Sequence, residues 1–403
     1  MSSWRRNQFA VTAASFVGFT GFTLVMPFLP LYIRQLGVED DGEVAFWTGL
    51  TLGVTPGLSA LCAPFWGRVA DRYGHKLMAE RALLSFVIVM AAMAYVTRPW
   101  HLFALRAALG FFAGYGALTM SMAARSAPRE RMAEAIGTIQ TAQRLGPALG
   151  PAMGGILAPL VGLRNAFLVS AAVYALAFCV VLFLYDEPAA QPGVREKTSA
   201  SAFGTILAFE NFILLMLVIF GLQFVDRSFG PVLPLYVGDL GFAPAEVPVI
   251  SGVLFSVLAF AAAAGNQLAA RLLKTMSARA LIASAAVVGA ASLVVFVVRP
   301  PLWGLVAAMA LFGACIGTAS TAAYTAAGAV MSPEAHATGF SFLTSASLVG
   351  LALSPVVAGF VGSRSIRAVF VGGIVILVVL AVVVRRLMVE RAPTTEAPAV
   401  EDA

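Results

Sequence analysis

Charged residues are scarce in this 403-residue sequence. Only 11% of the residues are Asp, Glu, Lys or Arg, whereas 60% are hydrophobic and the mean hydropathy is +0.89. Soluble domains carry about 25% charged residues, so the composition excludes an ordinary soluble protein. The net charge of +6 is small and dispersed along the chain, so we expect no nucleic-acid partner. The composition predicts an integral membrane protein.

Cysteine and histidine are also rare, with three residues of each. Cys62, Cys179 and Cys315 lie far apart in apolar segments, so the sequence predicts buried free thiols rather than a disulfide framework or a metal site. The sequence contains no G-x-x-x-x-G-K-[ST], G-x-S-x-G, H-E-x-x-H or Cys-x-x-Cys motif. We therefore expect no metal or cofactor, no ATP hydrolysis by this chain and no enzymatic activity.

Apolar segments long enough to cross a bilayer recur along the chain. They fall at residues 8–34, 45–66, 79–97, 100–122, 136–160, 166–185, 211–237, 246–270, 280–298, 302–325, 340–361 and 366–385. A polar segment separates the first six from the last six. We predict an all-α membrane fold with twelve transmembrane helices, divided into a six-helix bundle (1–185), a linker (186–210), a second six-helix bundle (211–390) and a disordered tail (391–403).

The basic residues predict the orientation of the chain in the membrane. Most of the 26 Lys and Arg residues fall in loops on the same side as the N-terminus, including Arg68, Lys76 and Arg131. The positive-inside rule then predicts that both termini are cytoplasmic. Trp4-Arg5-Arg6 precedes an apolar run too long for a signal-peptide core, so we expect the first helix to remain as an anchor. The excess of Arg and Ala over Lys is typical of a GC-rich bacterium, which favours a bacterial inner membrane.

The two halves of the chain contain matching segments at a constant offset. Pro27–Tyr32, followed by Leu36-Gly37, matches Pro231–Tyr236, followed by Leu240-Gly241. A second match joins the segment 146–155 to the segment 350–359. Because each half contains six predicted spans, the repeats have the same orientation in the membrane, which predicts a binding site between the halves.

The segment LGPALGPAMGG, residues 145–155, combines glycine and proline without any charge. Glycines that recur every four residues share one helix face and let another backbone approach closely. We assign an inter-bundle motif to Gly146, Pro147, Gly150, Pro151, Gly154 and Gly155. Given the repeat, we expect helices five and eleven to form a close, glycine-lined seam between the halves.

Asp226 is the one acidic residue that we expect near mid-membrane, and Arg227 follows it directly. An ionised carboxylate there is costly, so it must pair, protonate or face water. Three interpretations stay open: coupling to a proton gradient, a buried ion pair that holds helix seven, and plain lining of a cavity. Arg106, in helix four, is a second candidate for proton transfer or contact with an anion. Arg144 could extend its charge toward the membrane surface.

Aromatic and amide side chains cluster in the segments where a central cavity would lie. Aromatic faces suit hydrophobic or cationic ligands, and we expect about a third of these aromatic residues to line the cavity. The candidates are Phe22, Phe28, Tyr32, Phe112, Tyr115, Gln140, Gln223, Phe224 and Tyr236.

Three motifs carry a resemblance to a known family. The segment 67–76, GRVADRYGHK, resembles the signature loop of the major facilitator superfamily, G-x-L-A-D-R-x-G-R-K, with Val69 and His75 as departures. The segment 146–155 resembles the fifth-helix motif of its antiporters, and Arg106 with Gly110 and Gly114 resembles a fourth-helix motif with an embedded arginine. The resemblance extends over nearly the whole chain and is to the twelve-helix drug:proton antiporter, or multidrug efflux, branch.

The resemblance implies that the loop motif latches the two halves together on the cytoplasmic side. Its residues here are Gly67, Arg68, Asp71, Arg72, Gly74 and Lys76. Independently of any family, Gly67 and Gly74 permit a tight turn, and Asp71 can pair with an arginine or lie at a helix N-terminus. A loop that only sets the topology is the alternative.

The resemblance further implies proton-coupled export of hydrophobic or cationic small molecules by alternating access. The expected partners are the lipid bilayer, a small-molecule substrate and protons, with the chain acting as a monomer. One alternative is a transporter of the same fold for a sugar, a peptide or another metabolite. Another is a membrane receptor that does not transport.

Overall fold

The computed structural model describes residues 3–128, 131–187, 211–331 and 336–389, and all regular structure in these ranges is helical, as predicted. The first half contains α1 (Ser3–Leu24), η1 (Met26–Phe28), α2 (Leu29–Gln35), α3 (Asp41–Tyr73), α4 (His75–Met93), α5 (Pro99–Phe111), α6 (Tyr115–Ser126), α7 (Met132–Val161) and α8 (Leu163–Leu184). The second half contains α10 (Phe212–Arg227), α11 (Phe229–Asp239), α12 (Glu246–Leu272), α13 (Ala278–Val297), α14 (Leu302–Val330), α15 (His336–Gly362) and α16 (Ile366–Leu387).

Nine helical stretches in the described ranges are long and apolar enough to cross a membrane. Three predicted spans, formed by α4, α5 with α6, and α7, are not among the nine. Early charged residues such as Lys76 and Arg81 in α4, and the division of α5 from α6, account for two of these cases. All three pack directly against qualifying helices, α4 against α8 and α7 against α1. The chain is a multi-pass membrane protein, and its helices are consistent with the twelve predicted spans.

Two predicted spans are broken near proline. The first is divided into α1, η1 and α2 around Pro27 and Pro30, and the seventh is divided at Ser228, three residues before Pro231. Proline lacks a backbone donor and its ring clashes with the carbonyl four residues earlier, so a helix tends to bend or end just before it. The break in the seventh span therefore falls directly after Asp226 and Arg227.

The fourth span is broken between α5 and α6, where Gly114 has a φ of +108°. The break frees backbone carbonyls that lipid cannot satisfy. The indole nitrogen of Trp66 donates to the Phe111 carbonyl over 2.6 Å, and Arg81 Nη2 donates to the Phe112 carbonyl over 3.1 Å. The Arg81 guanidinium also lies 3.4 Å from the centroid of the Trp66 ring. Side chains of α3 and α4 thus supply the bonds that the break removes.

The internal repeat is confirmed by matched geometry in the two halves. Gly37 and Gly241, at equivalent positions after helices one and seven, have φ values of +92° and +90°. The Tyr32 hydroxyl donates to the Met93 carbonyl over 2.6 Å, and the Tyr236 hydroxyl donates to the Phe296 carbonyl over 2.7 Å. The repeated sequence therefore specifies the same turn and the same inter-helix bond twice.

A further matched pair lies where each half begins and ends. The Asn7 amide nitrogen donates to the Asp186 carbonyl over 2.7 Å, and the Asp186 N–H donates back to Asn7 Oδ1 over 3.0 Å. Asn211 makes the same reciprocal pair with Val389, over 2.8 and 3.0 Å. Each asparagine therefore ties the start of the first helix of its half to the end of the sixth. Asn7 and Asn211 are separated by the offset of the repeat, a match that is present in the sequence but was not among the repeat segments identified above.

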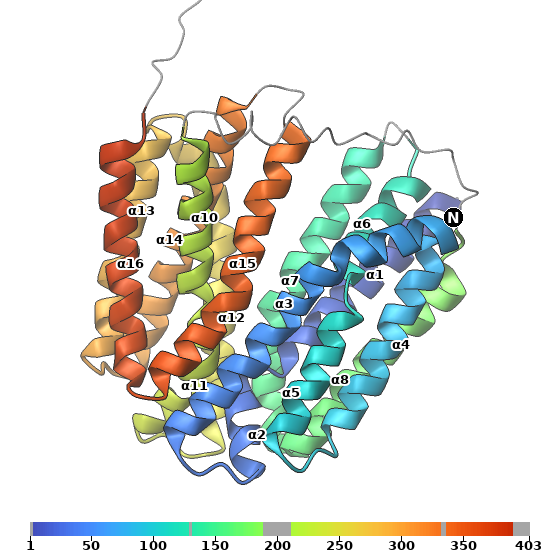
Figure 1. Cartoon of the computed structure of the whole chain (residues 1–403), viewed down its shortest axis with the longest axis horizontal. Helices are drawn as coiled ribbons and strands as arrows, with labels where there is room; N and C mark the ends of the chain where they lie inside the picture. The colour runs from blue at the N-terminus through green and yellow to red at the C-terminus, as the bar shows by residue number, and fades with distance from the viewer. Residues whose placement is uncertain (1–2, 129–130, 188–210, 332–335, 390–403) are drawn as a thin grey trace, which may run out of the picture.

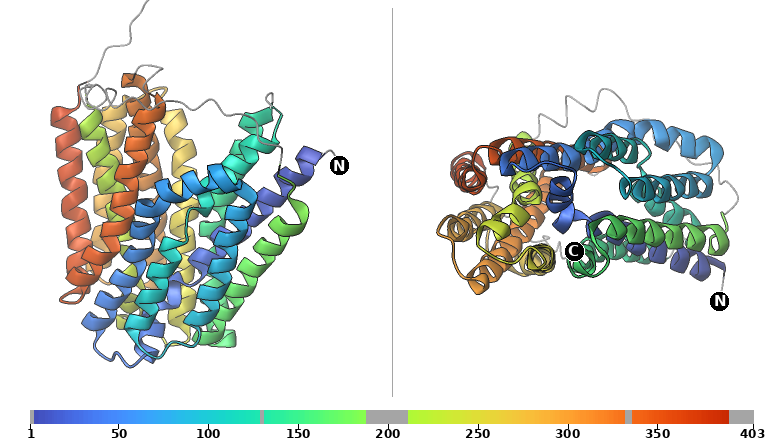
Figure 2. Two further views of the ribbon diagram at one scale, coloured as in Figure 1. Left: turned by 45° about the vertical axis from the view of Figure 1, so that its right-hand side comes forward. Right: turned by 90° about the horizontal axis from the view of Figure 1, so that it is seen from below.

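The two halves form two helical bundles that lie side by side (Figures 1 and 2). One buried cluster is built mainly from first-half residues and another from second-half residues. We call the end that carries Tyr73, Leu184, Phe212 and Leu387 the linker end; both described termini lie there. The predicted linker 186–210, apart from Asp186 and Glu187, and the predicted tail 391–403 lie outside the described residues.

The bundles meet toward the end away from the linker. α3 packs against α15, and α7 packs against α12. At Gly359 an added Cβ would lie 2.6 Å from the Ala45 carbonyl oxygen, and at Gly155 it would overlap the Pro248 carbonyl. The helices therefore approach each other through glycine, as expected.

The expected pairing across this seam is wrong in part. Helices five and eleven, α7 and α15, both lie at the interface, but each packs against a different helix of the opposite bundle. Moreover, Gly146 and Gly150 face α1 of their own bundle, at Thr20, and Gly154 faces α1 at Leu24. Of the six motif residues, Gly155 and Pro151 face α12 across the seam, and the neighbouring Ala152 N–H donates to Ser256 Oγ of α12 over 3.1 Å. The spacing of the glycines identified a close backbone contact, but it could not say which helix would make it.

Candidate functional site

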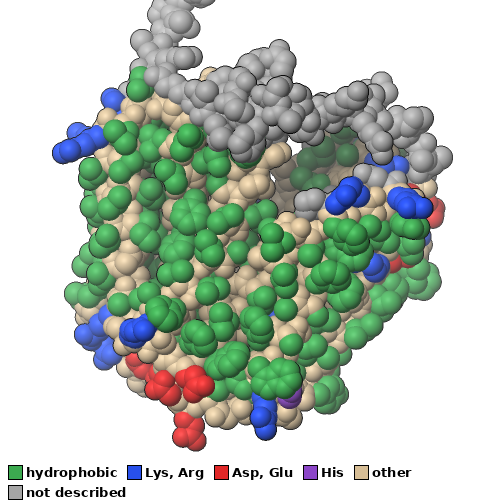
Figure 3. Space-filling model, viewed as in Figure 1, with side chains coloured by type: hydrophobic (Ala, Val, Ile, Leu, Met, Phe, Trp, Pro, Cys, Tyr) green, Lys and Arg blue, Asp and Glu red, His purple; other side chains and the backbone are tan. Residues whose placement is uncertain are grey.

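A cavity of about 400 Å³ lies between the two bundles. It is bordered by α1, α7, α10, α12 and α14, so both halves contribute to its wall. In the space-filling view the molecule is hollowed between its halves at the linker end (Figure 3). The repeat predicted a site between the halves, and the cavity lies there.

Two arginines and one carboxylate line this cavity. Asp226 Oδ2 lies 3.1 Å from Arg227 Nε, and the side chains are 14% and 37% exposed. Arg144, which is exposed, also lines the cavity. Asp226 is the only acidic residue among the described residues that line the cavity.

Three amides add hydrogen-bonding groups to the wall. Gln143 Nε2 donates to the Gly116 carbonyl over 3.1 Å and to Thr119 Oγ1 over 3.0 Å. Asn266 Oδ1 accepts from the Thr321 hydroxyl over 3.0 Å, and Gln223 is the third amide. Asn266 was missed in the sequence, although an amide inside the apolar helix α12 is a usable signal. Most other lining residues are apolar, including Met26 and Phe255.

Two of the predicted aromatic residues lie at a separate apolar pocket of about 210 Å³. Phe22 and Tyr115 line it together with Phe86 and Tyr174, and Leu348 and Leu351 of α15 close it from the other bundle. The pocket adjoins the break in the fourth span at Gly114. It is a second place where the bundles enclose a space that an apolar ligand could fill.

Arg106 is 1% exposed inside the first bundle and does not line the cavity of Asp226. Its Nε and Nη2 atoms have no hydrogen-bond partner among the described residues, while its carbonyl accepts from Thr55 over 2.9 Å. The structure therefore does not bring Arg106 and Asp226 together. Arg106 remains a buried charge without a carboxylate partner in the described structure.

Several other cavity candidates lie elsewhere, so those predictions are wrong. Phe28, Tyr32 and Tyr236 are fully buried in the bundle cores, where the tyrosines make the inter-helix bonds described above. Phe224 borders a small space between α10, α15 and α16. Phe112 packs beside Trp66. Gln140 is exposed on α7, one turn before Gln143 and Arg144 of the cavity wall, and its place in the site remains a prediction. Aromatic residues near the membrane centre fill cores as readily as cavities, and sequence alone does not separate the two.

The loop motif forms the junction between α3 and α4. Gly74, with a φ of +98°, makes the turn, but Gly67 lies inside α3, so the expectation that both glycines form the turn is wrong for Gly67. Glu187 accepts from the backbone N–H groups of His75 (2.7 Å) and Lys76 (3.3 Å).

Other residues of the motif also contact their own bundle. Lys76 Nζ donates to the Leu182 carbonyl over 3.0 Å, and the Arg72 guanidinium lies 5.4 Å from the Tyr73 ring centroid. Arg68 is described too, whereas the Asp71 side chain lies outside the described part. These contacts of Lys76 and Arg72 stay within the first bundle, and the latch between halves remains a prediction.

The fold, the repeat and the loop motif define a family, and the comparison with family models agrees. The model of the Major Facilitator Superfamily matches residues 11–298 and 215–403. The chain therefore belongs to the Major Facilitator Superfamily.

Among curated proteins, it is similar to the Multidrug resistance protein MdtG of Proteus mirabilis, with 36% identity over 264 residues, and to that of Escherichia coli, with 37% identity over 261 residues. These matches cover 65% and 64% of this chain and the same shares of the relatives.

Solved structures of low sequence identity share the fold. A bacterial homolog of the human lysosomal transporter Spinster, in an inward-facing and occupied conformation, has a TM-score of 0.76 at 18% identity, covering 94% of this chain and 95% of that one. The nucleoside transporter NupG has a TM-score of 0.75 at 17% identity, covering 97% and 100%. The D-xylose-proton symporter has a TM-score of 0.76 at 11% identity, covering 96% and 99%.

Proposed function

We propose that this chain is a secondary active transporter that exports hydrophobic or cationic small molecules in exchange for protons. One observation carries the proposal: a cavity between the two bundles is mostly apolar and contains one carboxylate, Asp226. Its similarity to proteins named for multidrug resistance supports the choice of substrate class. An apolar wall with one acid suits lipophilic cations.

Asp226 is the proposed coupling residue. A carboxylate that is only 14% exposed is stable when it is paired or protonated, so the carboxyl can exchange its contact with Arg227 for a proton. A bound cation and a proton then compete for the same carboxylate, which links export of one to entry of the other. Arg106 is proposed to contribute a second buried charge, which influences proton movement from within the first bundle.

The basic residues support an orientation with both termini in the cytoplasm of a bacterial inner membrane. In that orientation the bundles touch on the periplasmic side, and the hollow at the linker end opens to the cytoplasm. Rocking of the bundles about the α3–α15 and α7–α12 contacts would move the cavity to the other side. The loop motif 67–76 is proposed to latch the bundles when the cytoplasmic side closes, with the chain acting as a monomer.

A substrate screen in proteoliposomes with an imposed pH gradient tests this function. Tetraphenylphosphonium serves as a lipophilic cation, and movement against its own gradient is expected only when the pH gradient is present. Addition of the cation without a gradient is expected to release protons. The proposal fails if no hydrophobic or cationic compound in the screen moves in response to the gradient.

A second candidate function is transport of a polar metabolite, because Gln143, Gln223 and Asn266 bring three amides to the cavity. Amides at this depth suit a ligand with several hydroxyl or amide groups. The same liposomes distinguish the two functions. Accumulation of a radiolabelled sugar, nucleoside or dipeptide that tetraphenylphosphonium does not inhibit would favour the second candidate.

A further inference from the structure

The apolar pocket of about 210 Å³ and the cavity that contains Asp226 occupy equivalent places in the two halves of the chain. The offset of the repeat, which joins Pro27 to Pro231, also joins most residues that line the apolar pocket to residues that line the cavity. In both cases the wall comes mainly from one bundle and is completed by a helix of the other: α7 at the cavity and α15 at the apolar pocket. The repeat therefore forms the same binding space twice.

The equivalent positions of the two spaces differ in chemistry. Asp226 of the cavity corresponds to Phe22 of the apolar pocket, and Arg144 of the cavity corresponds to Leu348. The described residues that line the apolar pocket include no charged side chain. One copy of the space therefore suits a charged group, whereas the other suits a hydrocarbon group.

The two spaces adjoin each other at α1 and α7. Phe22 lines the apolar pocket, and Thr23, the next residue of α1, lines the cavity. Gln143 of the cavity wall donates from Nε2 to the carbonyl of Gly116, which lines the apolar pocket, over 3.1 Å. One molecule can therefore place a charged group in the cavity and an apolar group in the pocket.

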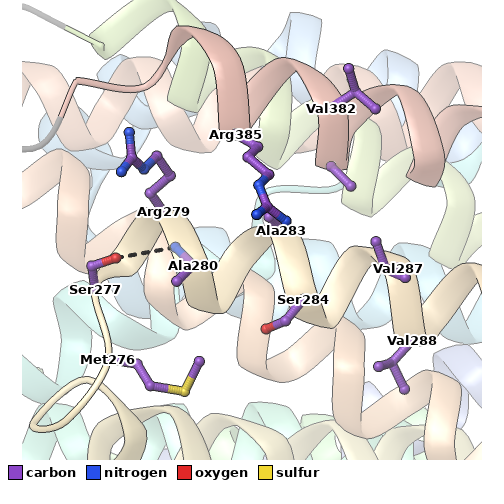
Figure 4. Close-up of a pocket in the computed structure, with 11 residues that line it drawn as sticks. Met276, Ser277, Arg279, Ala280, Ala283, Ser284, Val287, Val288, Val382 and Arg385 are labelled. Carbon is purple, nitrogen blue, oxygen red and sulfur yellow. Dashed lines mark hydrogen bonds between the residues drawn. The ribbon is translucent and has the colours of Figure 1, made fainter.

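A larger groove, of about 720 Å³, runs between α13 and α16 (Figure 4). Its described lining belongs to the second half alone, whereas both halves line the cavity and the apolar pocket. Transporters built from parallel repeats bind their substrates at the interface between the repeats. The apolar pocket shares this interface position with the cavity, and the groove does not.

We infer that the apolar pocket is a second subsite of the transport site, which binds an aromatic ring or a similar apolar group of the molecule whose charged group lies in the cavity of Asp226. The inference rests on the proposed function and narrows its substrates to amphiphiles that carry both groups. An apolar cavity of about 150 Å³ holds benzene, so a space of about 210 Å³ accommodates one ring with small substituents. Phe22 and Phe86 offer aromatic surfaces on which such a ring can pack.

Equilibrium binding to the purified chain in detergent, without a gradient, tests the subsite. Tetramethylammonium and benzyltrimethylammonium share a cationic group and differ by one ring. The wild type is expected to bind the benzyl compound at least about tenfold more tightly, because the ring is buried against an apolar wall. Leu348→Trp fills the pocket from α15 and is expected to remove most of this difference, while the affinity for tetramethylammonium stays within about twofold of the wild type.

Leu353→Trp is the matched control on the same helix. Leu353 is 48% exposed and lines neither space, so the tenfold difference is expected to persist in this variant. Leu348→Ala changes the pocket in the opposite direction and keeps the test valid if Leu348→Trp does not fold. The enlarged pocket is expected to improve binding of (1-naphthylmethyl)trimethylammonium at least about threefold relative to the benzyl compound.

The subsite and the proposed function can fail separately. Equal affinity of the wild type for tetramethylammonium and the benzyl compound would overturn the subsite, as would the same difference in folded Leu348→Trp and in Leu353→Trp. An unchanged preference between the naphthyl and benzyl compounds in Leu348→Ala would also overturn it. If the variants behave as expected but no compound moves in response to a pH gradient, the subsite stands and the proposed transport function fails.

Discussion

Asp226 Oδ2 lies 3.1 Å from Arg227 Nε, although neighbouring residues on a helix point about 100° apart. The pair lies at the last two residues of α10, directly before the junction with α11 at Ser228. An acid and a base thus stand together on the wall of the central cavity. The proposed coupling role and a purely structural role predict different behaviour for this pair.

Replacing Asp226 with Asn is expected to lower the rate of gradient-driven transport at least about tenfold. Substrate exchange without a gradient is expected to persist. The amide keeps the shape of the side chain but cannot bind and release a proton. Driven uptake and counterflow in the same proteoliposomes measure the two activities. Glu246→Gln, which changes an acid at the start of α12 away from the cavity, is the control.

A double variant separates coupling from structure. If Asp226 only neutralises Arg227, then Asp226→Asn combined with Arg227→Gln removes both charges and restores driven transport to the wild-type rate. If Asp226 carries the proton, the double variant stays uncoupled. Restoration would therefore contradict the proposed coupling role and favour a structural ion pair.

Glycines of α7 are expected to respond differently according to the helix they face. A Cβ on Gly146 would lie 2.9 Å from the Phe16 carbonyl oxygen of α1, so Gly146→Val is expected to cost about 1–3 kcal/mol through overpacking of the first bundle. Gly155 instead faces Pro248 of α12, so Gly155→Val is expected to impair transport through the seam between bundles. Thermal unfolding in detergent and driven transport measure the two effects.

Gly137 offers a matched control on the same helix. A Cβ there would meet no atom within 4 Å, so Gly137→Ala is expected to raise helix stability by about 0.5–1 kcal/mol. A loss of stability at Gly137 equal to that at Gly146 would show that α7 tolerates no substitution, and would contradict the assignment of specific faces.

The sequence predicted the features that arise from local chemistry. Prolines and glycines act on their own backbone, so Gly37 and Gly241, which the repeat matches, make the same turn in both halves. A carboxylate in an apolar segment is costly wherever the helix points, so Asp226 could be singled out from the sequence, and it lies on the cavity wall. Asn266 and Arg144 join it only through tertiary packing, because the face that a helix turns to a cavity depends on its neighbours.

Substitutions at Tyr32 and Tyr236 test whether these tyrosines belong to the bundle cores or to the substrate cavity. Each hydroxyl donates to a helix carbonyl, so Tyr32→Phe and Tyr236→Phe are each expected to cost about 1 kcal/mol and to leave substrate affinity unchanged. Thermal unfolding and a substrate-binding titration measure both quantities for each variant. If the affinity for substrate falls severalfold without loss of stability, these tyrosines line the substrate cavity and the assignment to the core is wrong.

Asn7 and Asn211 allow the same bond to be removed at equivalent places in the two halves. Asn7 is 5% exposed, whereas Asn211 pairs with Val389 at an exposed site. Water can replace exposed bonds, so Asn7→Ala is expected to cost about 1–3 kcal/mol and the bonds of Asn211 less. Asn211 also has a φ of +64°, which strains alanine but not glycine.

Three variants therefore separate hydrogen bonding from backbone strain. Asn211→Gly removes only the hydrogen bonds and is expected to unfold at a higher temperature than Asn211→Ala, in which strain is added. Asn7→Ala, inside α1, has no such strain and reports the buried bonds alone. Thermal unfolding in detergent ranks the three. If Asn7→Ala unfolds at the wild-type temperature, the reciprocal pair does not stabilise the junction of the first bundle.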